Sequence, residues 1–400
     1  MARPCVTPSC LLSVTMLRFL TAGESHGPGL VTIVEGLPAG LVVTEDGIAA
    51  ELARRRLGYG RGRRMSLEKD ELELIGGIRF GKTLGSPVAV VVRNTEWPRW
   101  QEEMSPNPGG SSRRPLETPR PGHADLAGMV KYDTRDARDV LERASARETA
   151  ARTVVGYLAK QLLATVGVAI VSHVVAIGEA VVAGDAPRPL PEDQGVIDAS
   201  PVRSFDKTGE TAMISAIEAA KTDRDTLGGV FEVLTYGLPI GLGSHVHWDR
   251  RLDAALAGAL MSIQAIKGVE IGDGYEVAGT PGSRAHDEIF HGEDGFVRNT
   301  NRAGGLEGGM TIGDVLRVRA AMKPISTVMR PLDTVNVVTK EAEKAFRERS
   351  DVCAVPAAAV VGEQMVAITL ATEIQRKFGG DTVGEMAGSV AAYRKHVAEF

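Results

Sequence analysis

A short pattern that occurs twice decides how this chain folds: LVTIVEGLPAGL at residues 30–41 and VFEVLTYGLPIGL at residues 230–242. Each copy is an apolar, strand-like run that ends in Gly-Leu-Pro-x-Gly-Leu. A helix-like segment follows each copy, Glu45–Arg56 in the first and Asp249–Ile266 in the second, and then opens into a glycine-rich loop. Two units with one order of elements therefore lie about 200 residues apart.

A second matching pair lies further along each copy. Gly76-Gly77-Ile78 with Gly81, Thr83 and Gly85 matches Gly304-Gly305-Leu306 with Gly309, Thr311 and Gly313. Both members lead into strand-like runs, Val88–Val92 and Val315–Arg319. Because the same order occurs twice, we predict an internally pseudo-duplicated α+β protein whose strands lie mostly in hairpins.

The rest of the chain predicts one long loop and three further helices. Residues 106–121 are rich in Pro, Gly and Ser, a composition typical of lids and binding loops. The helical patterns cover Ala137–Thr165, Thr211–Lys221 and Val360–Phe378, the last ending at Gly379-Gly380. We treat residues 1–15 as a tail or a misassigned start, and residues 16–400 as a single domain.

The overall composition excludes several classes of protein. Hydrophobic residues at 43% and charged residues at 24% are typical of a globular chain and exclude a disordered one. A net charge of -5 argues against a nucleic-acid binder, which is normally basic. The basic residues are 34 Arg and 12 Lys. Codon bias and a site that binds phosphate and carboxylate explain this excess of arginine equally well.

Cysteine usage and hydropathy indicate a cytoplasmic protein. Three cysteines (Cys5, Cys10 and Cys353) cannot form a disulfide framework in a chain of 400 residues. The longest charge-free stretch, 161–178, contains Gly167 and polar residues, and we interpret it as a helix end, a glycine stop and a buried strand. No membrane segment is expected, and the N-terminus is a poor signal peptide.

Two familiar patterns occur without the context that they need. Residues 76–83 match the phosphate-binding loop, but a β-branched run follows where that loop requires a helix. Residues 23–27 (GESHG) match the nucleophile elbow of serine hydrolases, but an apolar strand follows and predicts a hairpin. We reject both an ATP site and a hydrolase triad.

The densest chemical feature is the stretch from Arg54 to Arg64, in which six of eleven residues are arginine. Either these side chains point into solvent, which relieves their repulsion, or they form an anion site with charge-assisted hydrogen bonds. Further arginines lie in Arg120-Pro121-Gly122-His123, in a helical set and near the end of the chain: Arg143, Arg147, Arg152, Arg347 and Arg349.

Two of the eight histidines, His26 and His123, lie in loops beside glycine. Local packing does not explain a histidine there, and the ordinary pKa of imidazole suits proton transfer. His245 and His247 resemble a metal pair, but the sequence offers no clear third ligand and we predict no metal. His173 alternates with valines as a core residue would, and His286 beside two acids is expected at the surface.

Taken together, these segments resemble the chorismate synthase family. The matching stretches are AGESHG at 22–27, the arginines of 54–64, RPGHAD at 120–125, RASARET at 143–149, IKGVE at 266–270, 301–310, KPIST at 323–327, RSD at 349–351 and CAVP at 353–356. They run in one order from about residue 16 to the C-terminus, which makes the resemblance far more specific than any single motif.

The resemblance implies an activity that composition and spacing do not show. The family removes phosphate and a proton from 5-enolpyruvylshikimate 3-phosphate in a 1,4-anti elimination, which gives chorismate in the shikimate pathway. It requires reduced FMN, with NADPH only as an indirect reductant through a separate flavin reductase. It also implies homotetramers whose helices lie between mostly antiparallel sheets.

The same resemblance assigns roles to individual residues. His26 would donate a proton to the leaving phosphate, His123 would protonate or polarise the flavin, Ser25 and Ser145 would support them, and Asp351 would help flavin N5 accept the substrate proton. The implied substrate ligands, of which the first two could instead hold a nicotinamide nucleotide, are Arg55, Arg61, Arg63, Arg120, Arg147 and Arg347. The implied flavin contacts are Arg143, Ala144, Ser145, Gln264, Ala265, Gly308, Lys323, Pro324, Ile325, Ser326, Thr327 and Arg349.

Two other functions stay open at this point. One is a flavin reductase that oxidises NAD(P)H, although the chain shows no additional reductase domain. The other is a non-catalytic protein that binds anionic ligands or RNA through residues 54–64, against which the net charge of -5 and the two loop histidines speak.

Overall fold

The chain is described by a computed structural model that covers residues 16–61, 70–292, 295–346 and 351–400. In the first half, four antiparallel strands form a sheet of order β1-β2-β6-β3. These strands are β1 (Arg18–Ala22), β2 (Gly29–Glu35), β3 (Glu71–Gly76) and β6 (Val88–Arg93). Helix α1 (Glu45–Arg56) connects β2 to β3, and the short hairpin of β4 (Ile78–Arg79) and β5 (Lys82–Thr83) connects β3 to β6.

The second half repeats this arrangement. Its sheet has the order β10-β15-β9-β7-β8 and consists of β7 (Ala169–Ile177), β8 (Ala180–Val181), β9 (Gly229–Tyr236), β10 (Ile266–Ile271) and β15 (Leu316–Met322). Helix α8 (Leu252–Met261) follows β9, and the hairpin of β13 (Leu306–Glu307) and β14 (Met310–Thr311) precedes β15. Read from β7, the order β7-β9-β15-β10 matches β1-β2-β6-β3, which confirms the predicted duplication.

The repeated Gly-Leu-Pro-x-Gly-Leu pattern makes the same contacts in both halves. Thr83 Oγ1 donates to the Pro38 carbonyl at 2.6 Å and accepts from Leu41 N at 3.0 Å. Thr311 Oγ1 donates to the Pro239 carbonyl at 2.7 Å and accepts from Leu242 N at 2.8 Å. Each turn is thereby fixed to the short hairpin that follows it, which explains why the threonine recurs at the same place.

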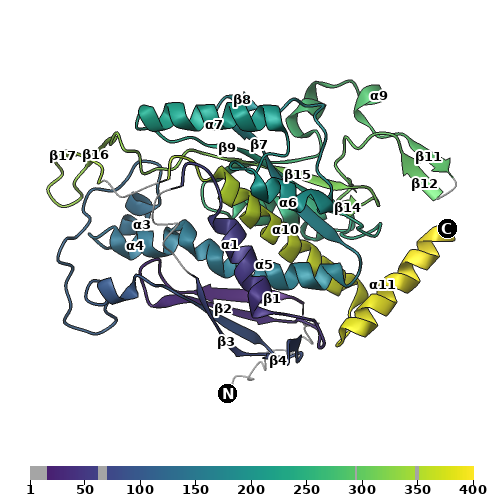
Figure 1. Cartoon of the computed structure of the whole chain (residues 1–400), viewed down its shortest axis with the longest axis horizontal. Helices are drawn as coiled ribbons and strands as arrows, with labels where there is room; N and C mark the ends of the chain where they lie inside the picture. Colours follow the sequence, from purple (N-terminus) through teal and green to yellow (C-terminus); the bar gives the residue numbers. More distant parts are fainter. Residues whose placement is uncertain (1–15, 62–69, 293–294, 347–350) are drawn as a thin grey trace, which may run out of the picture.

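Two long helices lie between the sheets and bury the core. These are α5 (Thr149–Ala164) and α10 (Val355–Phe378), which pack against each other. Figure 1 shows them crossing the middle of the molecule, with β1, β2 and β3 on one side and β7, β9 and β15 on the other. The helices therefore lie between mostly antiparallel sheets, as the resemblance implies.

Helix α10 is the one described helix long and apolar enough to cross a membrane, but 89% of its most apolar window is buried inside the protein. That burial explains its composition, since the helix packs against β7 and β9 of the second sheet and against α5. The other charge-free stretch, 161–178, contains the end of α5, a left-handed Gly167 with φ of 73°, and the buried strand β7, as predicted.

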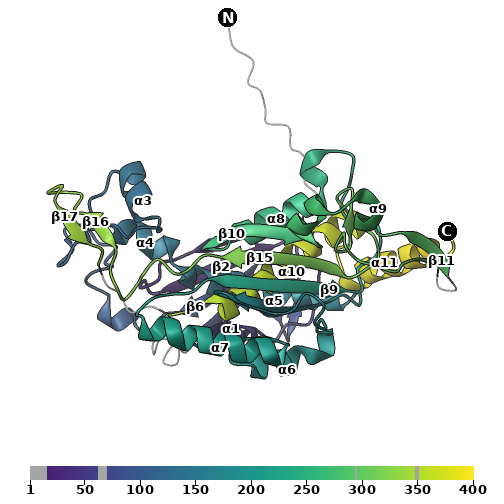
Figure 2. The ribbon, with the colours of Figure 1, turned by 90° about the horizontal axis from the view of Figure 1, so that it is seen from above.

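The remaining elements lie around this core. The helices are α3 (Asp125–Tyr132), α4 (Arg138–Ala144), α6 (Gln194–Ala199), α7 (Lys207–Thr222), α9 (Gly282–Ala285) and α11 (Val383–Ala398), with the 3-10 turns η1 (Trp97–Arg99), η2 (Ala146–Glu148), η3 (Pro191–Asp193), η4 (Trp248–Arg250) and η5 (Gly274–Gly279). Two hairpins pair β11 (Ile289–Gly292) with β12 (Gly295–Arg298), and β16 (Asp333–Val335) with β17 (Ala342–Lys344). In Figures 1 and 2, α3, α4, β16 and β17 gather at one end of the molecule.

Two predicted helices are divided or shortened, and two others start earlier than predicted, α7 at Lys207 and α10 at Val355. The pattern over Ala137–Thr165 is not one helix: it breaks at Ser145, whose backbone is extended (φ -62°, ψ 140°) and whose side chain accepts from Arg147 N. The predicted helix Asp249–Ile266 is shorter, because η4 precedes it and Ile266 already begins β10. The rejected motifs lie in hairpins, as expected: residues 76–83 span β3 to β5, and residues 23–27 connect β1 to β2.

Candidate active site

A cavity of about 580 Å³ lies where the two halves meet. All five side chains predicted to be catalytic line it, namely Ser25, His26, His123, Ser145 and Asp351. So do four predicted substrate ligands (Arg55, Arg61, Arg120 and Arg147) and eight predicted flavin contacts (Ala144, Ser145, Gln264, Ala265, Lys323, Ile325, Ser326 and Thr327). Its volume falls in the range of small-molecule sites.

The N-termini of both central helices contribute to the wall of this cavity. Ala146, Arg147 and Thr149 line it at the start of α5, and Asp351, Ala354 and Ala357 line it at the start of α10. A helix N-terminus presents unpaired amide groups and a partial positive charge, which favour anions. Two such termini beside four arginines make this a site for an anionic ligand.

Helix α1 separates the arginines of 54–64 into different environments. The helix starts with Thr44, whose side chain accepts from Gly47 N at 3.1 Å, and ends in three arginines that suit its negative C-terminal end. Arg55 is only 4% exposed and donates to Thr149 Oγ1 at 3.3 Å inside the cavity. Arg61 lies 3.2 Å from Asp351 Oδ2.

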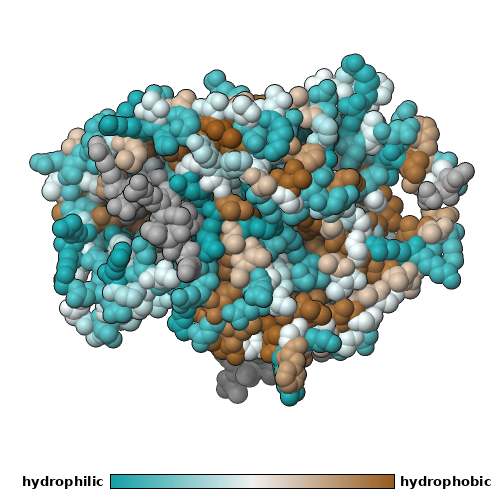
Figure 3. Space-filling model, viewed as in Figure 1, coloured by the Kyte–Doolittle hydropathy of each residue, from teal (hydrophilic) through white to brown (hydrophobic). Residues whose placement is uncertain are grey.

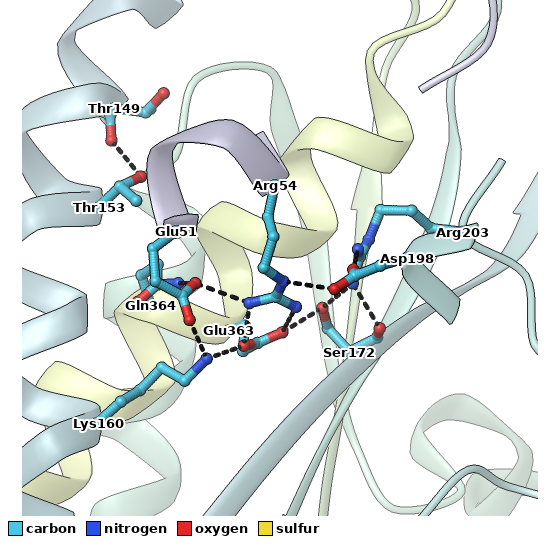
Figure 4. A network of polar contacts seen from close by, with 10 residues as sticks. All are labelled: Glu51, Arg54, Thr149, Thr153, Lys160, Ser172, Asp198, Arg203, Glu363 and Gln364. Atoms are coloured by element: carbon cyan, nitrogen blue, oxygen red, sulfur yellow. Dashed lines mark hydrogen bonds and ion pairs between the residues drawn. The ribbon is translucent and has the colours of Figure 1, made fainter. Parts of the chain in front are cut away.

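Arg54 points the other way and does not line the cavity. Figure 4 shows its guanidinium between Glu51, Asp198 and Glu363. Arg56 pairs with Asp70, which also contacts Arg147 at 2.6 Å. The alternative in which these arginines point into solvent is therefore wrong for Arg54, Arg55 and Arg61. These three side chains consequently give no support to an RNA-binding loop.

His26 lies in the connection between β1 and β2, where the carboxylate of Glu142 on α4 holds its side chain. Glu142 Oε1 lies 2.8 Å from His26 Nδ1, and Glu142 Oε2 accepts from His26 N at 2.8 Å. Burial by itself raises the pKa of a carboxyl group, but the His26 hydrogen bonds and charge hold the pKa of Glu142 below its ordinary value. Ser145 Oγ donates to Ser25 Oγ at 3.2 Å, so the two serines lie together beside the histidine.

His123 has a carboxylate partner as well. Its Nδ1 contacts Asp125, which also accepts from Arg120 N at 3.1 Å, Arg120 Nε at 2.9 Å and Arg120 Nη2 at 3.2 Å. Burial pushes the pKa of Asp125 upward, but the hydrogen bonds from His123 and Arg120 lower it to about 2. The Gly122 carbonyl accepts from Ser326 Oγ at 2.8 Å, which joins this loop to the 323–327 segment.

The cavity fits a large planar ring with polar edges. Leu141, Ile263, Met322, Ala358 and Val361 form apolar walls. Within the described part of the chain, the buried Gln264 Oε1 has no hydrogen-bond partner, so it can accept a hydrogen bond from a ligand. Ala265 next to it has a left-handed backbone (φ 69°), a strained conformation for alanine that is typical of ligand sites.

Lys323 supplies a cation at the same wall. Burial, together with the neighbouring Lys267, lowers its pKa from the ordinary value. The residues present therefore suit a flavin, which combines an apolar ring system with hydrogen-bonding edges and a phosphate.

Three predicted flavin contacts do not line this cavity. Arg143 instead donates to the Thr21 and Gly23 carbonyls and faces a second, smaller hollow of about 390 Å³. Gly308 lies in the β13–β14 turn, and Pro324 lies beside cavity residues without lining it. Arg63, Arg347 and Arg349 lie outside the described residues, as does the predicted tail of residues 1–15.

The histidines outside the cavity have other surroundings. His173 is buried in β7 and lies 3.2 Å from Glu232 Oε2, whereas His286 is exposed. His247 contacts Asp249 at 2.7 Å. In the part of the chain that the structure describes, no three His, Cys, Asp or Glu side chains are grouped so that they could hold a metal ion.

Sequence reasoning missed four residues that support the predicted ones: Trp100, Asp125, Glu142 and Asp70. Asp125 had a signal, since it is an acid two residues from His123 and ends the RPGHAD stretch at 120–125. Glu142 and Trp100 had none, because they lie 116 and 74 residues from His26 in the sequence.

Comparison with known proteins identifies the family. The family model described as chorismate synthase matches residues 17–374. A chorismate synthase of Thermobifida fusca is 61% identical over 94% of this chain and 98% of its own, and one of Leifsonia xyli is 57% identical over 96% and 97%. A solved structure titled "Crystal Structure of Chorismate Synthase" is 42% identical, covers 97% of this chain and 100% of its own, and has a TM-score of 0.78. The chain belongs to the chorismate synthase family of lyases.

Proposed function

We propose that this protein removes phosphate and a proton from 5-enolpyruvylshikimate 3-phosphate in a 1,4-anti elimination that yields chorismate, with reduced FMN as cofactor. One observation carries the proposal: a single cavity brings His26, His123 and four arginines together at the N-termini of α5 and α10. The substrate has one phosphate and two carboxylates, and the cavity offers the matching positive groups.

The arginines and helix termini bind and orient the substrate anions. Arg55, Arg61, Arg120 and Arg147 are held by neighbouring side chains, so their guanidinium groups need little reorganisation when a ligand arrives. Fixed donors that neutralise a phosphate group also stabilise it as it leaves. His26 supplies the proton to that phosphate from its imidazole, and Ser25 lies beside it.

His123 and Asp351 serve the cofactor and the removal of the substrate proton. His123 is positioned by Asp125, and Asp351 lies against Arg61 at the start of α10. We assign His123 to the cofactor side and the Asp351 carboxylate to handling of the substrate proton.

The flavin would be held by Ala144, Ser145, Gln264, Ala265 and the 323–327 segment, with Arg143, Gly308 and Arg349 as further implied contacts. When bound, reduced FMN supplies electron density to the reacting centre. NADPH enters only as the source of reducing equivalents, through a separate flavin reductase. Arg63 and Arg347 would be further substrate ligands.

We also propose that the protein is a cytoplasmic homotetramer. The outer face of the first sheet supports an assembly, because its cross-strand neighbours Leu20 and Ile33 are 69% and 44% exposed and Ile75 is 57% exposed. Apolar surface also gathers over this part of the molecule in Figure 3. Exposed apolar faces of this kind mark contacts between proteins.

The test is anaerobic incubation with 5-enolpyruvylshikimate 3-phosphate and dithionite-reduced FMN, followed by measurement of released phosphate. We expect His26→Ala and His123→Ala each to lower turnover about 10- to 1000-fold, or about 1.4–4 kcal/mol of barrier. The matched control is His247→Ala, a histidine that lies outside the cavity and is 56% exposed, which should keep the parent rate. Parent-like rates in both cavity variants would reject the assigned roles.

The same assay separates the alternative functions. Steady anaerobic consumption of NADPH without an added reductase would favour a flavin reductase. Binding of RNA with steep salt dependence, without phosphate release, would favour the non-catalytic protein.

A further inference from the structure

Three side chains form a closed set of contacts around His26. Glu142 bonds to the imidazole edge, and Trp100 lies on its face with ring centroids 4.0 Å apart and planes inclined by 31°. Arg138 closes the set: its Nη1 donates to Glu142 Oε1 at 3.0 Å, and its guanidinium carbon lies 4.9 Å from the centre of the Trp100 ring. We name Glu142, Trp100 and Arg138 the His26 clamp.

The clamp comes from three separate parts of the chain. His26 belongs to the β1–β2 connection, Trp100 follows the turn η1, and Arg138 and Glu142 are one turn apart on α4. Glu142 and His26 are 3% and 8% exposed. His26 and Glu142 are buried groups from distant segments, joined by charge-assisted hydrogen bonds. Moving the imidazole would break these bonds at a cost in free energy, so the contact restricts the orientation of the ring.

The hydrogen bonds of His26 determine which nitrogen of its ring is protonated. The carboxylate accepts from His26 N and faces Nδ1, so Nδ1 must be protonated to donate to it. Proton exchange with a ligand in the cavity then has to use Nε2. Glu103 Oε1 lies 3.8 Å from Arg138 Nε on one side of the clamp. The titratable and charged groups that line the cavity with His26 are His123, Lys323, Asp351 and the arginines Arg55, Arg61, Arg120 and Arg147.

We propose that Glu142 and Trp100 are positioning residues for His26: Glu142 keeps a proton on Nδ1 and stabilises the imidazolium, and Trp100 fixes the plane of the ring. This inference rests on the proposed function for its kinetic consequence. The geometry of the clamp stands apart from that function, so a test without turnover is possible.

Trp100 provides that test, because its indole ring lies against the His26 imidazole and its fluorescence depends on that contact. The chain has three tryptophans, so the Trp97→Phe/Trp248→Phe double variant leaves Trp100 as the single tryptophan. We expect His26→Ala to change the Trp100 emission, because the imidazole no longer covers the indole face. Glu142→Gln should change the emission in the same direction, because the imidazole loses the carboxylate that holds it in place.

The control is Glu232→Gln, which removes the other buried carboxylate that contacts a histidine, at 3.2 Å from His173. It should leave the Trp100 emission as in the parent. Parent-like Trp100 emission in Glu142→Gln or in His26→Ala would overturn the inference. Glu142→Asp, which keeps the charge, provides a second variant should Glu142→Gln not fold, and its emission should be closer to that of the parent.

Kinetics give the second readout. Glu142→Gln should lower kcat at least tenfold while the KM for the phosphorylated substrate changes less than about threefold. Trp100→Phe should retain more activity than Trp100→Ala, because an aromatic ring still covers the imidazole. A raised KM with unchanged kcat would assign Glu142 to substrate binding and overturn the positioning role. If no variant or parent turns over, the proposed function fails while the fluorescence result stays interpretable.

Discussion

Replacing Glu363 by glutamine removes the charge at the centre of the ion network between α1, α5, α6 and α10 (Figure 4). Its side chain is 0% exposed. Arg54 donates to both of its oxygens, at 2.9 and 3.0 Å, Ser172 Oγ donates at 2.8 Å, and Lys160 pairs with it as well. Burial favours the neutral acid, but these cations hold the pKa of Glu363 well below its ordinary value.

The expected cost follows from what the substitution leaves behind. Removing one partner of a buried ion pair costs about 3–5 kcal/mol, because the other charge stays buried. Glu51 and Asp198 still contact Arg54, and Glu51 still contacts Lys160, so we expect the lower end, about 3 kcal/mol. For a chain of 400 residues this corresponds to about 4 °C in the melting temperature.

Thermal unfolding followed by calorimetry measures this effect. The control is Glu399→Gln, whose pair with Lys395 is 65% and 79% exposed and should change stability by less than about 0.5 kcal/mol. The double variant Arg54→Met/Glu363→Met should be more stable than Glu363→Gln, because it removes the buried charge as well as its partner. A loss below about 1 °C in Glu363→Gln would refute the reasoning.

Three further predictions follow from the same structure. The pKa of Asp125 is lowered to about 2, so its contribution to stability is present above about pH 4 and is lost as the pH falls toward about 2; melting temperatures from pH 2 to 6 should decline less steeply in Asp125→Asn. Burial raises the pKa of the Cys353 thiol to about 11, so this thiol should be unreactive in the native protein. Titration of the native protein with a thiol reagent should therefore give the same number of reactive thiols for Cys353→Ser as for the parent, and a lower number for the variant would contradict this. Gly156→Ala should destabilise by about 1–3 kcal/mol in urea unfolding, because its Cβ would lie 2.3 Å from the Gln364 side chain; Gly388→Ala in α11, with nothing within 4 Å, should be neutral or stabilising.

The duplicated architecture was predictable because its determinants are local and occur twice. Thr83 and Thr311 make the same two hydrogen bonds to their Gly-Leu-Pro turns, so selection for one geometry leaves one spacing in both halves. Helix α1 was predicted with its observed ends, since a capping threonine precedes it and its arginines accumulate in its last turn. Local patterns are enough for such elements.

Features set by distant contacts were not predictable in the same way. The helical pattern runs through Ser145 without interruption, yet the chain turns there so that Ser145 reaches Ser25 and α5 starts at the cavity. Adjacent residues also differ: Arg54 enters the ion network, whereas Arg55 enters the cavity, because one residue turns a helix by about 100°. Only the tertiary packing of α1 decides which arginine serves which purpose.

The candidate site shows the same division. The histidines and arginines that line the cavity were found from residue type, loop context and family resemblance. Their partners Glu142 and Trp100 were missed, because neither residue stands near His26 in the sequence or in a recognisable pattern.

The central claim is that one cavity holds the polyanionic substrate and the flavin together. A crystal structure of the protein soaked with FMN and 5-enolpyruvylshikimate 3-phosphate tests it most directly. We expect both molecules in the 580 Å³ cavity, with the substrate anions against Arg55, Arg61 and Arg120 and the flavin beside Gln264 and Lys323. A cavity that stays empty while either compound binds elsewhere on the protein would contradict the account.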